Sequence, residues 1–135
     1  QVAQLVICNR THEKAQQLQN VFSDYGNIFA KPIEDLLSPF DLVINSTSAG
    51  LTGQLISLPS VIVDKTTDCY DMTYSQHTTV FNQWAKDQKA HKTADGLGML
   101  VGQAAKSFNL WRGVTPNTSP VMEKLRSSLA QKVPS

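Results

Sequence analysis

Three short polar stretches each follow an apolar, strand-like run, and they hold the side chains best suited to bind a ligand. They are Asn9-Arg10-Thr11, residues 45–50 and residues 71–74. In a parallel α/β sheet, ligands bind beyond the carboxyl ends of the strands. A fourth stretch, residues 95–103, opens a periodic helix. These four stretches are therefore the candidate binding segments of the chain.

The first stretch offers a guanidinium on Arg10 and an ammonium on Lys14, one helical turn apart at the start of a helix. Such groups at a helix N-terminus bind phosphate well. In dinucleotide-binding folds an acidic residue after the second strand holds the ribose of NAD, whereas an Arg accommodates the 2′-phosphate of NADP. The neutral Asn9 and cationic Arg10 thus favour NADP. The pattern fits a solvated Arg-Thr cap before a surface helix equally well.

The other stretches are weaker signals when each is taken alone. Thr47 and Ser48 lie in a small polar turn whose backbone N–H groups could face a nucleotide, although a simple turn explains the pattern. Gly96, Met99 and Gln103 share one helix face, and Gln103 could hydrogen-bond a polyhydroxylated substrate. A Gly-rich helix start with a surface Gln is the alternative interpretation.

Alternating strands and helices without tight hairpins predict an α/β fold with a parallel sheet flanked by helices. We expect strands within residues 2–8, 28–30, 40–45, 68–72 and 92–94. We expect helices at residues 12–22, at 33–37, after a Thr79 cap, at 98–111 and from a Ser119 cap onward. Residues 61–63 also have strand composition. Leu97, Leu100, Val101, Ala104, Ala105, Phe108 and Trp111 form one apolar face of the fourth helix.

Composition excludes several classes of protein. The 135 residues suffice for one domain, and 41% hydrophobic with 17% charged residues is a globular balance. A net charge of +1 predicts no nucleic-acid partner, and no apolar run is long enough to span a membrane. Cys8 and Cys69 lack metal-ligand spacing, so we expect no metal, two small buried residues and a reducing cytoplasm. Because Gln1 opens directly on strand-like sequence, we expect a piece of a longer protein.

Taken together, the four stretches resemble the shikimate dehydrogenase family. The shared motifs are Asn-Arg-Thr-x-x-Lys at 9–14, Asp-Leu-Val-Ile-Asn-Ser-Thr-Ser at 41–48, Tyr-Asp-Met-x-Tyr at 70–74 and Ala-Asp-Gly-Leu-Gly-Met-Leu-Val at 94–101. Their order and spacing match the family across essentially the whole chain. The resemblance implies a Rossmann-like NADP-binding domain over residues 1–135, C-terminal helices included. It also implies NADPH-dependent reduction of 3-dehydroshikimate to shikimate in aromatic amino-acid (chorismate) biosynthesis.

Positions that match the family's motifs acquire expected roles from this resemblance. The expected clamp for the adenosine 2′-phosphate comprises Asn9, Arg10, Thr11 and Lys14. Thr47 and Ser48 resemble the turn against the adenosine part of the cofactor, and Met72 and Gly96 match contacts to the nicotinamide end. Tyr74 and Gln103 match positions that hydrogen-bond shikimate.

The chain also departs from the family in ways that limit its expected activity. Ser46 replaces a usual Ala, and Val80 replaces a common Pro. The first strand, its Gly-rich pyrophosphate loop and the N-terminal substrate domain with its catalytic Lys and Asp are all lacking. No catalytic residue is thus expected here, and the fragment alone should be inactive. The family further implies a helical turn near residues 59–62, against the strand composition of 61–63.

Two rival functions remain open at this stage. A quinate/shikimate dehydrogenase is one, although an acidic residue in place of Asn9-Arg10 would suit it better, and a non-catalytic dinucleotide-binding module is the other. A nucleic-acid-binding protein has only net charge in its favour, and +1 is too little. The whole protein could be a monomer or a dimer.

Overall fold

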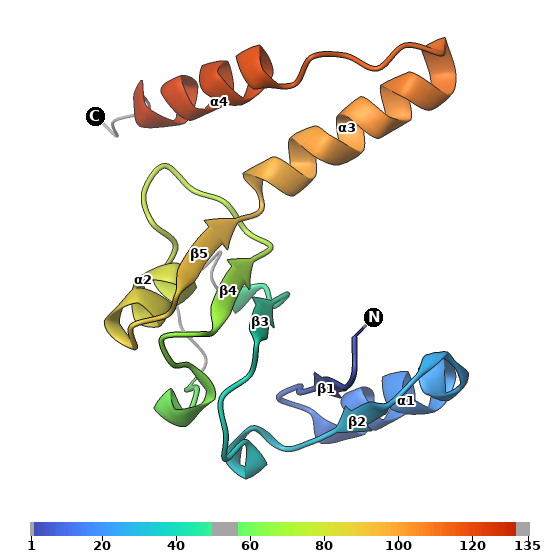
Figure 1. The fold of residues 1–135 in the computed structure, drawn as a ribbon, viewed down its shortest axis with the longest axis vertical. Helices are drawn as coiled ribbons and strands as arrows, with labels where there is room; N and C mark the ends of the chain where they lie inside the picture. The colour runs from blue at the N-terminus through green and yellow to red at the C-terminus, as the bar shows by residue number, and fades with distance from the viewer. Residues whose placement is uncertain (1, 50–56, 132–135) are drawn as a thin grey trace. The chain divides into compact units, whose positions relative to one another are not determined.

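The computed structural model describes residues 2–49 and 57–131, and it divides the chain into two compact units. The first unit contains residues up to Pro39 together with Ser57–Ile62. The second contains the chain from Phe40 onward except for that short segment. Each unit has its own parallel sheet, and Figure 1 shows the elements of both.

The first unit is a β-α-β element. Strand β1 (Leu5–Ile7) pairs in parallel with β2 (Ile28–Ala30), and helix α1 (His12–Phe22) connects them. Ala15 on α1 is fully buried, and the Gln19 side chain accepts a hydrogen bond from the Ala30 backbone N–H at 2.6 Å. Helix α1 is thereby fixed to β2. Short 3-10 turns occur at Ser23–Tyr25, Ile33–Asp35 and Ser60–Ile62.

The second unit carries a three-stranded parallel sheet of order β3-β4-β5. The strands are β3 (Leu42–Asn45), β4 (Asp68–Asp71) and β5 (Lys92–Asp95). Helix α2 (Val80–Asp87) crosses between β4 and β5, and α3 (Leu97–Arg112) and α4 (Ser119–Gln131) follow. The core of this unit is made of small and large apolar side chains: Val63, Cys69, Phe81, Ala85, Leu97 and Val101.

Local sequence explains where the helices of the second unit begin and end. The Thr79 hydroxyl accepts a hydrogen bond from the Asn82 N–H, which satisfies one free donor at the start of α2. Gly113 ends α3 in the left-handed conformation at φ 70°, where a side chain would be strained.

The predicted α/β class with parallel strands and flanking helices is confirmed by the strand pairing, and so is the predicted order of its elements.

Three details differ from the sequence-based expectation, whereas a fourth agrees with the family resemblance. Residues 60–62 form the helical turn that the resemblance implied, here a 3-10 turn, and not the strand that the composition of residues 61–63 suggested. Helix α4 already includes Ser119, and Thr118 accepts the first helical hydrogen bond from Met122 N–H, so the predicted Ser119 cap is wrong by one residue. The strands form two sheets, because in the described residues β1 pairs only with β2 and β3 only with β4. Finally, Trp111 is 80% exposed, so the apolar face of α3 is buried only near its start.

Candidate functional site

The carboxyl ends of β3 and β4 are tied together by side chains that also shape the two turns beyond them. Asn45 Nδ2 donates to Asp71 Oδ1 at 3.2 Å. Asn45 Oδ1 accepts the Thr47 hydroxyl at 2.8 Å and its backbone N–H at 3.2 Å. Asp71 Oδ1 accepts the hydroxyl and the N–H of Thr73 at 2.9 and 3.1 Å. Both polar turns are therefore held rigidly at the same edge of the sheet.

Gly96 joins this edge from the start of α3. Its N–H donates to the Thr73 carbonyl at 2.8 Å, and a Cβ placed on Gly96 would lie 2.0 Å from the Met72 carbonyl oxygen. Only a residue without a side chain fits so close to another backbone. The close backbone approach that Gly96 permits is thus made by Met72.

Several predicted site residues of the second unit gather around this edge with exposed side chains. Met72 and Tyr74 follow β4 and are 41% and 44% exposed. Thr47 is half-buried and Ser48 is exposed. Gln103 is exposed on α3, about 10 Å along the helix axis from Gly96. Gly50, the end of the turn after β3, lies outside the described residues.

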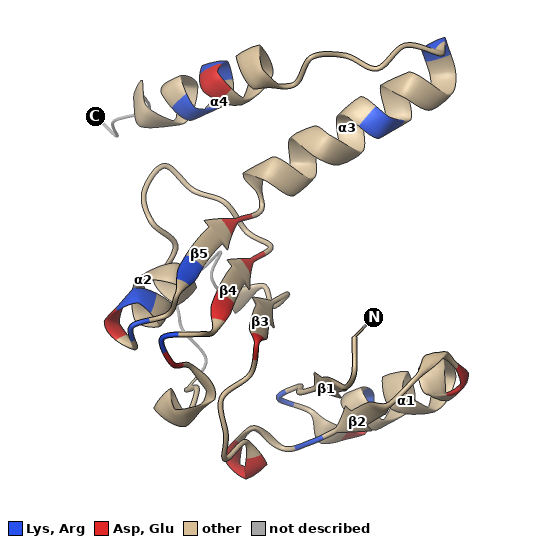
Figure 2. Ribbon diagram, in the orientation of Figure 1, with Lys and Arg blue, Asp and Glu red and all other residues tan. Residues whose placement is uncertain are grey.

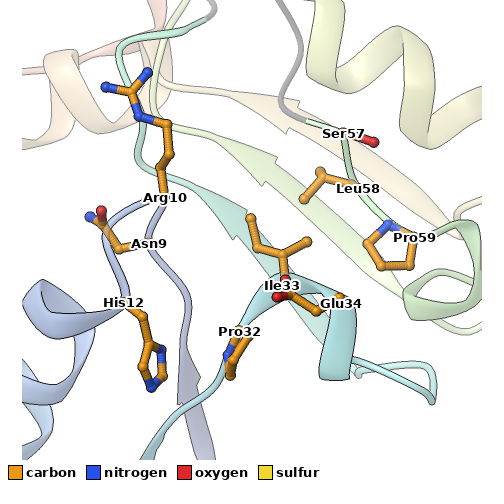
Figure 3. Close-up of a pocket in the computed structure, with 9 residues that line it drawn as sticks. All are labelled: Asn9, Arg10, His12, Pro32, Ile33, Glu34, Ser57, Leu58 and Pro59. Carbon is orange, nitrogen blue, oxygen red and sulfur yellow. The ribbon is translucent and has the colours of Figure 1, made fainter.

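The first unit has a pocket of its own at the carboxyl ends of β1 and β2, with a volume of about 560 Å³. Figure 3 shows its lining residues: Asn9, Arg10, His12, Pro32, Ile33, Glu34, Ser57, Leu58 and Pro59. The Asn9 side chain accepts a hydrogen bond from the Thr11 N–H at 2.9 Å, which shapes the chain between β1 and α1. Thr11 stands at the N-cap of α1 as predicted, although its own side chain makes no capping bond.

Polar groups of this pocket are available for a ligand. Arg10 is exposed and has no hydrogen bond or ion pair to the part of the chain that the structure describes. Its side chain extends away from that of His12 (Figure 3). His12 Nδ1 is buried and has no hydrogen-bond partner among the described residues. The pocket therefore combines a free cation with an unpaired ring nitrogen.

Sequence reasoning identified only part of this pocket. Asn9 and Arg10 were predicted and line it, whereas Thr11 and Lys14 were predicted and do not. His12, Glu34 and the segment 57–59 line it without having been predicted. Pro32 and Ile33 could have been found by the rule already applied to Asn9, because they follow β2 as Asn9 follows β1. Residues 57–59 carried no such signal, since no strand precedes them directly.

Charged residues are distributed over both units (Figure 2). Burial raises the pKa of Cys69 to about 11, with a smaller contribution from Asp68. Burial also raises the pKa of Cys8, partly offset by Lys31. Hydrogen bonds from Thr66 lower the pKa of Asp64.

The described residues contain neither a metal-binding cluster nor a membrane-spanning helix. No group of three or more His, Cys, Asp or Glu side chains is placed to hold a metal ion. None of the helices that the structure describes combines the length and the apolar character needed to cross a membrane. Cys8 and Cys69 are both free thiols.

Comparison with known proteins agrees with this geometry. Residues 96–126 match the family model described as the shikimate 5′-dehydrogenase C-terminal domain. A shikimate dehydrogenase (NADP(+)) of Vibrio atlanticus is 52% identical over 93% of this chain and 46% of its own length. One from Shewanella woodyi is 50% identical over 91% and 45%. A Thermus thermophilus shikimate 5-dehydrogenase, solved with NADP(H) and shikimate, is 28% identical with a TM-score of 0.75, covering 92% of this chain and 46% of that one.

The chain spans about half the length of the curated relatives it matches. The motifs, the parallel α/β fold and these identities lead to one conclusion. The chain belongs to the shikimate dehydrogenase family.

Proposed function

We propose that this chain is the NADP-binding part of a shikimate dehydrogenase, an enzyme that reduces 3-dehydroshikimate to shikimate with NADPH and catalyses the reverse reaction. The observation that carries the proposal is the ordered edge of the second unit. There Thr47, Met72, Tyr74 and Gly96 are brought together by the Asn45–Asp71 hydrogen bond and by the bond from Gly96 to Thr73. The 52% identity to an NADP(+) enzyme supports the proposal independently.

The pocket of the first unit fits the adenosine end of NADP. Its unpaired Arg10 guanidinium can take a 2′-phosphate through two parallel hydrogen bonds, and Asn9 lies beside it. Thr11 and Lys14 would contribute from the first turn of α1, although neither side chain lines the pocket. Glu34 is the one unfavourable group of the lining, because a carboxylate repels a phosphate. The orphaned His12 Nδ1 offers an additional polar contact.

At the edge of the second unit, Thr47 and Ser48 would face the adenosine part of the cofactor and Met72 and Gly96 its nicotinamide end. When bound, the cofactor supplies the hydride of the reaction. Tyr74 and Gln103 would donate hydrogen bonds that orient shikimate. Proton transfer requires an acid/base group in reach of the substrate oxygen. In the family that role belongs to a Lys and an Asp outside this chain, so the 135-residue chain by itself should not turn over substrate.

The test compares the 135-residue chain with a longer protein in which it is joined to the substrate domain. We expect NADPH to bind the chain weakly, as titrated by nucleotide fluorescence, without any oxidation of shikimate by NADP⁺. The longer protein should oxidise shikimate with NADP⁺ and much more slowly with NAD⁺.

The quinate/shikimate dehydrogenase and the non-catalytic module each give a different result in this test. Faster oxidation of quinate than of shikimate would favour a quinate/shikimate dehydrogenase. Tight nucleotide binding without turnover in the longer protein would favour a non-catalytic module.

We place the protein in the cytoplasm, in keeping with its two free cysteines. Its oligomeric state, monomer or dimer, stays a prediction.

A further inference from the structure

Helix α4 is joined to the rest of the second unit by two polar contacts, one to Asp95 at the end of β5 and one to Gln76 in the segment between β4 and α2. Arg126 donates from both terminal nitrogens to the Asp95 carboxylate, each bond being 2.6 Å long. Four residues later along α4, the Ala130 carbonyl accepts a hydrogen bond from Gln76 Nε2 at 3.2 Å. Helix α4 turns back after α3, so that these contacts bridge 31 and 54 residues of sequence (Figure 1).

Both contacts lead to the segment that carries Tyr74. Asp95 Oδ1 also accepts the Leu97 N–H at 3.2 Å, which holds the first residue of α3. Gly96, between these two residues, donates its N–H to the Thr73 carbonyl at 2.8 Å. Arg126 is therefore connected to the residue before Tyr74, whereas Gln76 is two residues after it. Tyr74 itself is 44% exposed, so its backbone depends on these flanking contacts for its position.

The ion pair is asymmetric in its exposure. The Asp95 side chain is 11% exposed and the Arg126 side chain 48% exposed. Hydrogen bonding to Asp95 raises the pKa of Arg126, so this side chain stays charged at every ordinary pH. If Arg126 is removed, Asp95 keeps a largely buried charge without its counter-ion. Such a carboxylate turns toward water, and its bond to the Leu97 N–H would then be lost.

We infer that Arg126 is a positioning residue, one that fixes the Tyr74 segment and the start of α3 through Asp95. It acts without touching substrate or cofactor. The inference rests on the proposed function in one respect, the identity of the molecule that the positioned residues bind. In a shikimate dehydrogenase, Arg126 would set the affinity of the subsite formed by Tyr74 and Gln103 for the substrate. The connection from Arg126 to Thr73 does not depend on that function: it runs through the hydrogen bonds to Asp95, the peptide bond to Gly96 and the hydrogen bond from Gly96 to Thr73.

The first experiment measures amide hydrogen exchange on two separate variants of the 135-residue chain, Arg126→Gln and Lys124→Gln. Lys124→Gln is the matched control, because it removes an exposed charge from the same helix. We expect the amides of Gly96 and Leu97 to exchange about tenfold faster in Arg126→Gln, with α2 and β4 unchanged. The control should match the native chain. Arg126→Lys, which cannot form the paired bonds, should give an intermediate rate.

Two results would overturn the inference: unchanged exchange at Gly96 and Leu97, or equal acceleration throughout the second unit, which would mean a general loss of stability. In the longer enzyme, Arg126→Gln should raise the KM for shikimate about fivefold or more. The KM for NADP⁺ should rise less, because Gly96 and Met72 adjoin the positioned segment whereas the Arg10 pocket of the first unit does not. An equal rise in both KM values would also contradict the positioning role. If the native enzyme does not act on shikimate, the proposed function fails, whereas the exchange measurement still decides the role of Arg126.

Discussion

At the scale of single residues, Arg10 is the side chain whose removal should be most informative. It is exposed and has no partner in the described residues, so Arg10→Ala costs little folding energy. A charge-assisted hydrogen bond contributes roughly 1.5–3 kcal/mol, and its loss should weaken NADPH binding about 10- to 100-fold. NADH, which lacks the 2′-phosphate, should lose less than about threefold.

Fluorescence titration with the two nucleotides measures both effects. Lys31→Ala is the matched control, since it removes a cation from the same unit and does not line the pocket. Equal weakening of NADPH and NADH by Arg10→Ala would show that Arg10 supports the pocket without contacting the phosphate.

Cys69 gives a second prediction, which concerns pH. Its side chain is 2% exposed, and its pKa of about 11 lies above the ordinary thiol value because burial disfavours the thiolate. The folded state therefore holds the thiol proton more tightly than the unfolded state. The resulting stabilisation is complete below the unfolded pKa near 9 and is lost as pH rises toward 11.

The free energy of unfolding should accordingly fall by up to roughly 3 kcal/mol over this window because of Cys69 alone. Urea unfolding of the native chain and of Cys69→Ala, at several pH values, isolates that contribution from those of Lys and Tyr. The difference between the two proteins should shrink as pH rises. A constant difference would mean that the Cys69 thiol ionises normally in the folded chain.

Sequence reasoning succeeded at residues whose position follows from a strand and failed at residues brought together by tertiary contacts. Asn9, Arg10, Thr47 and Met72 lie shortly after the ends of strands, and their place at the carboxyl edges could be predicted. His12 and Glu34 line the pocket only because α1 and β2 pack together, which no local pattern encodes. The Arg126–Asp95 pair was equally hidden, because 31 residues separate its members.

At the scale of secondary structure, the start of α3 depends on one glycine out of three. A Cβ on Gly96 would lie 2.0 Å from the Met72 carbonyl oxygen, whereas a Cβ on Gly98 or Gly102 meets no atom within 4 Å. Gly96→Ala must move the backbone of either α3 or the turn after β4. We expect it to destabilise the second unit by about 1–3 kcal/mol.

Gly98→Ala and Gly102→Ala are the matched controls, and both should stabilise the chain by about 0.5–1 kcal/mol because Ala has the higher helix propensity. Thermal or urea unfolding followed by circular dichroism measures all three changes. Equal effects at the three positions would show that the contact with Met72 does not constrain Gly96.

Element types were predictable where a long periodic pattern existed and ambiguous where it did not. The apolar spacing of residues 12–22 predicted α1 with its observed bounds. Residues 61–63 are a short apolar run, which periodicity cannot assign, and the structure makes 60–62 a 3-10 turn. Burial was harder still: Phe108 and Trp111 continue the apolar stripe of α3 but are 44% and 80% exposed.

At the scale of the whole molecule, the sequence predicted one parallel sheet and the structure has two. Strand composition shows that a segment is extended, but it does not specify its hydrogen-bonding neighbour. Each of the two compact units has its own sheet. The second unit thus has β3 as an edge strand, paired with β4 alone among the described residues.

This edge leads to the last prediction. Leu42 and Ile44 on β3 are 52% and 54% exposed, and an apolar parallel edge is a template for pairing with another chain. The 135-residue chain should therefore associate as its concentration rises. Ile44→Lys places a charge on the edge, and because Ile44 is already half exposed, the change should cost less than about 1 kcal/mol of stability.

Light scattering coupled to size-exclusion chromatography, over a range of concentrations, measures this association. Ser128→Lys, at an exposed position of α4, gives the same net charge and controls for general repulsion between chains. We expect Ile44→Lys to reduce the associated fraction several-fold and Ser128→Lys to leave it nearly unchanged. If both variants reduce association equally, net charge and not the β3 edge governs it, and the exposed side chains of β3 then have no role in self-association.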